Sequence, residues 1–156
     1  MNKTLVAYFS CTGETKKVAE KINEVVQGEL HEITPEVPYT SEDLNWEDKT
    51  SRSTIEMEDL SSRPSITNEL TNMEEYSTIY LGFPIWWYTA PTIINTFLES
   101  YDFSNKKIII FCTSGGSSLE KTFNDLKSKY NYNFIEWKRL SSSTTDEEIR
   151  EFVDNI

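Results

Sequence analysis

The chain has 156 residues, with 15 basic and 26 acidic side chains and a net charge of −11 at pH 7. Its length suits one domain, and its acidity argues against nucleic acid or an anionic membrane as the main partner, because both bind clustered Lys and Arg. The sequence has no apolar run of about 18 residues, so it predicts no membrane-spanning helix. The start of the chain resembles no secretory signal, and its two cysteines cannot form a disulfide framework. We therefore expect a soluble, cytoplasmic protein.

The first predicted elements are a strand, a helix and a second strand. Residues 3–9 are a short apolar run typical of a buried strand, and residues 14–27 repeat apolar side chains at the spacing of one helix face. Gly28 is expected to end this helix, because glycine readily adopts the left-handed conformation found there. Residues 29–33 predict a shorter strand with more charge.

The stretch from residue 34 to residue 75, called here the long connection, contains no strong strand pattern. Connections of this length are uncommon in compact domains and often form lids or binding loops. We expect a short helix around residues 41–48 and assign no other element. Residues 29–75 carry 13 acidic and 3 basic side chains, which is −10 of the total charge of −11. Such a stretch is usually a solvated surface, and the alternative is a docking face for a basic partner.

The second half of the chain alternates strands and helices. Strands are predicted at 78–83, 107–112 and 133–138, and helices at 91–100, from Ser117 or Ser118 to about 129, and at 145–153. The runs at 3–9 and 107–112 are continuously apolar, which indicates burial on both faces of a parallel sheet. The sequence therefore predicts a three-layer α/β fold, a doubly wound parallel sheet of five strands between helices.

In such a fold, ligands bind beyond the carboxyl ends of the strands. The first loop there, residues 10–15, is Ser10-Cys11-Thr12-Gly13-Glu14-Thr15. Its hydroxyls surround a glycine just before a helix N-terminus, where free N–H groups and the helix dipole favour an anion, so the loop predicts phosphate binding. It matches neither the nucleotide triphosphatase motif nor the glycine-rich dinucleotide motif.

Two more loops are expected at the same edge. The second loop, residues 84–91, contains Pro84, Ile85, Trp86, Trp87 and Tyr88, and its aromatic side chains can border a flat aromatic ring. The third loop, residues 113–117, begins Thr113-Ser114-Gly115-Gly116, where paired glycines let the backbone approach a ligand closely. A ligand with a phosphate at one end and a planar heteroaromatic ring at the other fits all three loops, and flavin mononucleotide (FMN) is such a ligand.

These loops resemble those of the flavodoxin family. The first loop has the family's hydroxyl-x-Thr-Gly-x-Thr pattern, and the second and third are similar to those of a flavodoxin-like subgroup. The resemblance implies a five-stranded parallel sheet in the order 2-1-3-4-5 and non-covalently bound FMN. It implies that the first loop binds the phosphate, mostly through N–H groups and hydroxyls, and that the other two border the ring. The residues predicted to bind the cofactor are Ser10, Cys11, Thr12, Gly13, Glu14, Thr15, Pro84, Ile85, Trp86, Trp87, Tyr88, Thr113, Ser114, Gly115 and Gly116.

The sequence departs from the family pattern in two places. Cys11 stands where many flavodoxins carry a hydroxyl or a small residue, and the long connection is unlike that of short flavodoxins. Tyr39, Trp46 and Arg52 of the long connection are candidates to close over the site. Because a helix N-terminus lowers the pKa of a thiol, a redox role for Cys11 is also left open.

The function predicted from these features is that of a low-potential one-electron carrier. A phosphate site without an evident Arg, an aromatic border and a charge of −11 would all disfavour the negatively charged reduced flavin. The acidic surface predicts redox partner proteins with basic docking faces, and we expect a monomer. The alternative is an FMN-dependent NAD(P)H:quinone-type oxidoreductase, which would use the same three loops.

Two other protein classes share the predicted architecture. A low-molecular-weight tyrosine phosphatase needs Cys-x5-Arg after the first strand, but Lys17 stands six positions after Cys11, and it lacks the planar fork that clamps a phosphate. A response-regulator receiver needs a phosphorylatable Asp at the end of the third strand, where this chain has Phe83 and Pro84. The sequence disfavours both classes.

Overall fold

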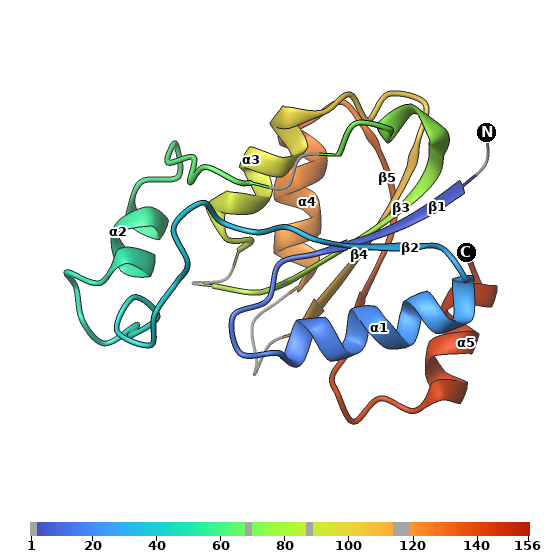
Figure 1. Cartoon of the computed structure of the whole chain (residues 1–156), viewed down its shortest axis with the longest axis horizontal. Helices are drawn as coiled ribbons and strands as arrows, with labels where there is room; N and C mark the ends of the chain where they lie inside the picture. The colour runs from blue at the N-terminus through green and yellow to red at the C-terminus, as the bar shows by residue number, and fades with distance from the viewer. Residues whose placement is uncertain (1–2, 68–69, 87–88, 114–118) are drawn as a thin grey trace.

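The computed structural model describes residues 3–67, 70–86, 89–113 and 119–156. Within these residues the strands form one five-stranded parallel sheet in the order β2-β1-β3-β4-β5 (Figure 1). The strands are β1 (Lys3–Tyr8), β2 (Glu29–Glu32), β3 (Tyr76–Pro84), β4 (Lys107–Thr113) and β5 (Asn133–Arg139). The predicted fold class and strand order are confirmed.

Helices cover both faces of the sheet (Figure 1). The helices are α1 (Glu14–Val26), α2 (Arg52–Glu58), α3 (Thr92–Ser100), α4 (Leu119–Lys129) and α5 (Asp146–Asp154), with a 3-10 turn η1 at Met73–Glu75. Helices α1 and α5 lie on one face, and α3 and α4 on the other. Successive side chains of a strand point to opposite faces, so each central strand contributes to both cores. None of the described helices is long and apolar enough to cross a membrane.

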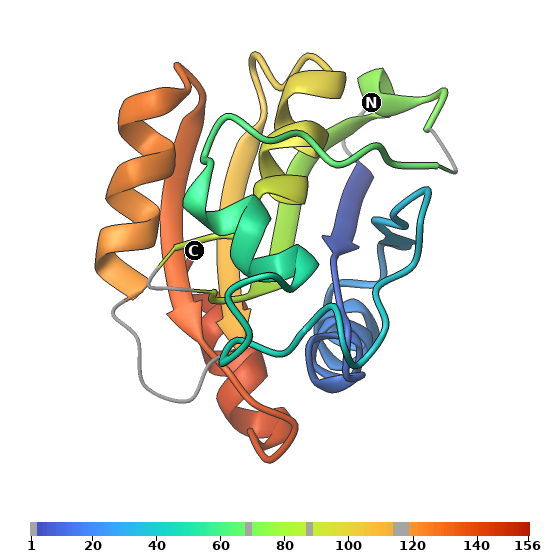
Figure 2. The same cartoon turned by 90° about the vertical axis from the view of Figure 1, so that its left-hand side faces the viewer.

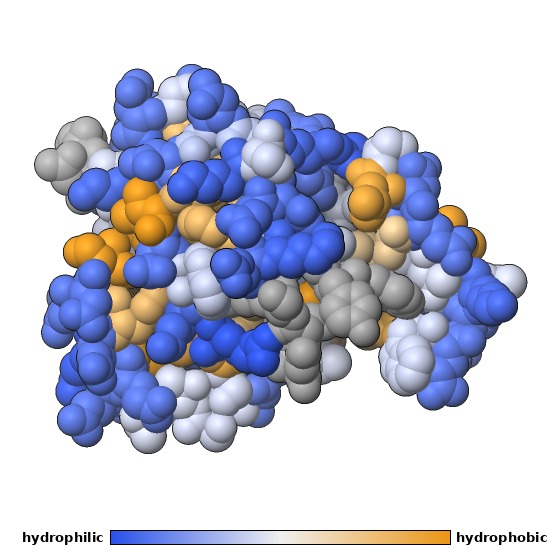
Figure 3. All heavy atoms as spheres, turned by 180° about the vertical axis from the view of Figure 1, so that it is seen from behind, coloured by the Kyte–Doolittle hydropathy of each residue, from blue (hydrophilic) through white to orange (hydrophobic). Residues whose placement is uncertain are grey.

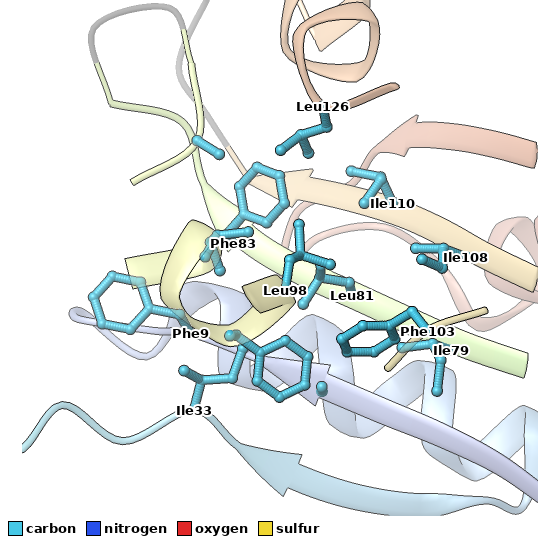
Figure 4. Close-up of a cluster of buried hydrophobic side chains, with 14 of the residues drawn as sticks. Phe9, Ile33, Ile79, Leu81, Phe83, Leu98, Phe103, Ile108, Ile110 and Leu126 are labelled. Carbon is cyan, nitrogen blue, oxygen red and sulfur yellow. The ribbon is translucent and has the colours of Figure 1, made fainter. Parts of the chain in front are cut away.

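The alternation is clearest in β1. Val6 and Tyr8 pack in the cluster with α1 and α5, whereas Leu5 and Ala7 pack in the cluster with α3. Figure 4 shows part of the second cluster, in which Phe9 lies beside Ile33 just beyond the ends of β1 and β2. Burial on both faces explains why the central strands are continuously apolar.

The strand register brings the predicted loops to one edge of the sheet. Tyr8 at the end of β1 pairs with Gly82, and Pro84 at the end of β3 pairs with Thr113 at the end of β4. The first, second and third loops therefore all begin at the same edge. Helix α2 and the first part of the long connection lie at the end of the molecule that faces the viewer in Figure 2, and the last part, with η1, leads to the start of β3 at the opposite edge of the sheet.

The prediction that Gly28 ends α1 in a left-handed conformation is wrong. Gln27 takes that role, with φ 52° and ψ 45°. Gly28 is needed for another reason, because a Cβ atom there would lie 2.4 Å from the carbonyl oxygen of Thr4. A glycine at this position lets the chain pass close to β1 as it enters β2.

The helix expected around residues 41–48 is also absent, because that segment consists of turns. Thr40 and Asp43 cap each other, with N···O distances of 2.9 and 3.2 Å, but no amphipathic run follows them to bury against the sheet. The helix of the long connection is α2 instead. It is capped by Ser51, whose hydroxyl accepts a hydrogen bond from the N–H of Thr54.

Candidate functional site

A cleft lies at the carboxyl edge of the sheet, where the predicted loops meet. Its volume is about 430 Å³, and its described lining consists of Thr12, Glu14, Pro84, Ile85, Trp86, Thr113, Leu140 and Ser141. The cleft thus brings together residues of the first and second loops and the beginning of the third. Trp87, Tyr88, Ser114, Gly115 and Gly116, which were also predicted to bind the cofactor, lie outside the described residues.

The first loop presents backbone N–H groups at the N-terminus of α1. Gly13 has φ 91°, which favours glycine, and its N–H donates to the Ser10 hydroxyl at 3.1 Å. The first hydrogen bond of the helix runs from the N–H of Lys17 to the carbonyl of Gly13, also at 3.1 Å. The amides of residues 14–16 therefore have no acceptor within the helix, and no described side chain caps it. This arrangement suits an anion.

Two buried threonines connect the first loop to the end of β4. The hydroxyl oxygens of Thr15 and Thr113 lie 2.7 Å apart, and the residues are 2% and 5% exposed. This contact fixes the start of α1 against the strand from which the third loop begins. Thr12, by contrast, is exposed at the cleft, so its hydroxyl is accessible to a ligand.

The loop between β5 and α5 also contributes to the cleft, which the sequence analysis missed. The Glu14 carboxylate accepts a hydrogen bond from the N–H of Ser142 at 2.7 Å, and this bond lowers the pKa of Glu14 below its usual value. Lys21 of α1 donates to the carbonyls of Ser142 and Thr144 at 2.7 and 3.0 Å. The run of five hydroxyl residues at 141–145, directly after the fifth predicted strand, was a signal that could have identified this loop.

The second loop turns back on itself beside the cleft. Trp86 and Thr89 exchange two backbone hydrogen bonds, at 2.9 and 3.0 Å, and the N–H of Ile85 donates to the carbonyl of Thr113 at 3.1 Å. The Trp86 ring is half-buried. It packs edge-on against Phe9, with ring centroids 5.7 Å apart, and against Tyr39, at 5.6 Å. Trp86 therefore borders the cleft and also belongs to the edge of the core.

Two of the three candidates from the long connection lie beside this aromatic cluster. Tyr39 contacts both Phe9 and Trp86, and the Arg52 guanidinium lies 3.8 Å from the centroid of the Tyr39 ring. Trp46 does not contribute to the described lining of the cleft and is 69% exposed. Tyr39 and Arg52 thus lie next to the site, and Trp46 is a surface residue.

Cys11 is a poor candidate for redox chemistry. It is half-buried, and burial raises the pKa of its thiol to about 12, although the nearby Arg52 charge opposes this shift. Desolvation of the thiolate by burial is the largest cause of this shift. Cys11 lines a second, smaller pocket of about 260 Å³, which also includes Ser10 and Tyr39.

The described lining of the main cleft contains no Lys or Arg, and Glu14 is its one charged member. An anion bound at the first loop would thus be held by N–H groups and hydroxyls rather than by a cationic side chain. The Pro84–Trp86 segment provides an apolar border on another side of the same cleft. Together these features suit a ligand that has a phosphate and a flat ring.

Comparisons with known proteins agree with this geometry. A protein assigned as a flavoprotein from Bacteroides uniformis is 45% identical over 98% of both chains, with a TM-score of 0.94. Another from Bacteroides eggerthii is 44% identical over 100% of this chain and 98% of that one, with a TM-score of 0.95. A flavoprotein from Lactobacillus acidophilus, solved in complex with FMN, is 26% identical over 98% of this chain and 99% of that one, with a TM-score of 0.75.

No curated protein shows significant sequence similarity to the chain. A family model described as flavodoxin, in contrast, matches residues 3–156. This match covers nearly the whole chain and agrees with the observed strand order. The chain belongs to the flavodoxin family.

Proposed function

We propose that this protein binds FMN non-covalently in the main cleft and carries one electron at a time between redox partners. Membership of the flavodoxin family and the FMN complex of the Lactobacillus relative support FMN as the cofactor. The observation that carries the proposal is the cleft itself, which joins uncapped helix amides and hydroxyls to the Pro84–Trp86 border.

Each part of the site has a distinct task in holding the cofactor. Ser10 fixes the turn at Gly13, so that the amides at the start of α1 are directed to one point, where they would hold the phosphate. The Thr12 hydroxyl is accessible at that end of the cleft, and Trp86 and Pro84 would border the ring and exclude water from it. The bound flavin supplies the electron-transfer chemistry, and the protein sets its orientation and its potential.

The charge around the cleft favours a carrier with a low potential for the second electron. Glu14 is its one charged described lining residue, and the whole chain has a net charge of −11. Negative charge added to the cofactor on reduction would be repelled by the Glu14 carboxylate and by the net charge of the chain. The described lining has no cationic side chain that would offset this repulsion. This repulsion makes the second electron harder to add than the first.

The test is a stepwise anaerobic reduction of the protein loaded with FMN, followed by visible absorbance and electron paramagnetic resonance. We expect two separate one-electron steps, the second at a potential below that of free FMN. A single two-electron step, or a second potential at or above that of free FMN, would contradict the carrier role. Rapid oxidation of NADPH by the same sample in the presence of a quinone would favour the oxidoreductase instead.

We also propose that the redox partners have basic docking faces and that the protein works as a monomer. Residues 29–75 carry most of the net charge, and hydrophilic residues predominate on the face seen in Figure 3. Attraction between unlike charges speeds association and weakens with ionic strength. The association rate with a basic reductase should therefore fall steeply between low and physiological salt, and a rate that is independent of salt would contradict this proposal.

A further inference from the structure

Three aromatic rings form a cluster beside the cleft, and they come from three separate segments. Phe9 directly follows β1, Trp86 belongs to the second loop and Tyr39 to the long connection. Each pair of rings packs edge-on, with centroids 5.6 to 5.7 Å apart. Trp86 alone of the three lines the main cleft, whereas Tyr39 lies behind it and lines the smaller pocket with Ser10 of the first loop. Tyr39 thus contacts Trp86 and shares a pocket with the first loop.

Two charged side chains of α2 hold Tyr39 in this position. Its hydroxyl donates to Oε1 of Glu56 at 2.5 Å, and Nε of Arg52 donates to Oε2 of the same carboxylate at 3.0 Å. The Arg52 guanidinium also stacks on the Tyr39 ring and donates to the carbonyl of Val37 at 2.6 Å. Both charged side chains are largely buried, with 22% and 14% exposed. Tyr39 is therefore fixed by ring stacking and by a hydrogen bond to a charged group, both of which have directional geometry.

Helix α2 is in turn connected to α3 by polar contacts of Ser62. The Ser62 hydroxyl lies 2.9 Å from the carbonyl oxygen of Glu56 and 2.9 Å from the hydroxyl of Thr92. Thr92 is the first residue of α3, follows the second loop directly and is 2% exposed. Helix α2, which carries the Arg52 and Glu56 that contact Tyr39, is therefore connected through Ser62 to α3, the helix that follows the second loop.

We propose that Tyr39 is a positioning residue for the cofactor site, and that Glu56 and Arg52 hold it so that the Trp86 ring keeps a fixed orientation at the cleft. This inference rests on the proposed function and deepens it, because it assigns a binding task to the long connection. If the Trp86 ring is already fixed before the ligand binds, less side-chain freedom is lost on binding, and a flat ligand binds more tightly.

The chain contains a matched control for this proposal. Arg63 pairs with both oxygens of Glu99 at 3.0 Å, and the Tyr130 hydroxyl donates to the same carboxylate at 2.5 Å. This second Arg–Glu–Tyr group joins the long connection to α3 and the end of α4, and none of its members is in the described lining of the cleft. It has the same chemistry, although it is more exposed.

The experiment compares Tyr39→Phe and Glu56→Gln with Tyr130→Phe and Glu99→Gln. FMN dissociation constants are measured on each apoprotein, together with thermal stability and near-ultraviolet circular dichroism before FMN is added. We expect Tyr39→Phe and Glu56→Gln each to weaken FMN binding about five- to tenfold. Their double variant should be little weaker than the worse single one, because both substitutions break the same contact. Near-ultraviolet signals of these apoproteins should change as well.

The control variants should bind FMN within about twofold of the wild type, even where their stability falls. Wild-type affinity in Tyr39→Phe and Glu56→Gln would overturn the positioning role while leaving the proposed function intact. Equal weakening in all four variants would also overturn it, because the effect would then be general destabilisation. A wild-type protein that does not bind FMN would overturn the proposed function, and this inference with it.

Discussion

The sheet and the long connection are stabilised in different ways. In the central strands, side chains such as Ile79 and Ile109 are 0% exposed and pack against helices on both faces. The long connection exposes several of its large apolar side chains, with Val37 at 63% and Trp46 at 69%, and is held by ion pairs and hydrogen bonds such as Arg52–Glu56. The sheet thus depends on apolar burial, whereas the connection adds ion pairs and hydrogen bonds to a few buried apolar side chains such as Met57 and Met73.

Because of this difference, we expect the sheet to determine mainly the stability of the protein and the long connection to affect mainly the binding of a ligand. Apolar burial contributes most of the folding free energy, so substitutions in the sheet should mainly change stability. Segments held by a few polar contacts open at lower free energy and often carry binding residues. The cleft lies between the two regions, because its first, second and third loops begin at strand ends while Tyr39 supports Trp86 from the long connection.

The largest effect is expected for Phe111→Ala in β4. Phe111 is 0% exposed, and its ring lies so close to Gly82 that a Cβ atom there would approach it to 2.1 Å. Removing the ring leaves a cavity, and the free energy of unfolding should fall by about 3–5 kcal/mol, measured by urea denaturation. Trp46→Ala in the long connection is the comparison and should stay within about 0.5 kcal/mol of the wild type. Similar losses in both variants would contradict this difference between the sheet and the long connection.

A smaller effect on stability, but a clear one on binding, is expected for Thr15→Val. The substitution removes the hydroxyl that contacts Thr113 and leaves the shape of the side chain nearly unchanged. Unfolding free energy should fall by about 1 kcal/mol, and FMN binding should weaken about tenfold, measured by fluorescence titration. Thr96→Val in α3, a threonine outside the described lining of the cleft, serves as the control. If Thr15→Val bound FMN as tightly as the control does, the contact between Thr15 and Thr113 would have no part in binding.

The smallest effect is expected for Glu14→Gln and depends on pH. The hydrogen bond from Ser142 lowers the pKa of Glu14 below 4.5, so the ionised carboxylate stabilises the fold. That contribution is complete above about pH 4.5 and is lost as the pH falls through the lowered pKa. The difference in unfolding free energy between wild type and Glu14→Gln should therefore shrink from pH 7 to pH 3. A constant difference would show that the carboxylate charge has no part in the contact.

The sequence predicted the regions built on apolar burial best. Continuous apolar runs such as 107–112 indicated a parallel sheet, and the strand boundaries differ from the predicted ones by at most two residues. A helix was expected from residue 145, and Thr145 and Glu148 form a reciprocal cap at its start. These features follow from local patterns, since each depends on residues close together in the chain.

The parts that could not be predicted depend on polar contacts between distant segments. Helix α2 buries Ser53, Thr54 and a single apolar side chain, Met57, so hydrophobic periodicity could not reveal it. The contact between Glu14 and Ser142 joins residues 128 positions apart, and that between Tyr39 and Glu56 depends on a helix that the sequence did not indicate. The resemblance to flavodoxins identified the loops of the site, but not the contacts that support Trp86.

The most direct test of the account compares the binding of FMN and riboflavin to the apoprotein, followed by visible absorbance. The two ligands share the ring and differ in the phosphate, which the first loop should hold through N–H groups and hydroxyls. We expect one FMN bound per chain with a shifted flavin band, and riboflavin bound at least about 100-fold more weakly. Equal affinity for the two ligands, or no binding of FMN, would contradict it.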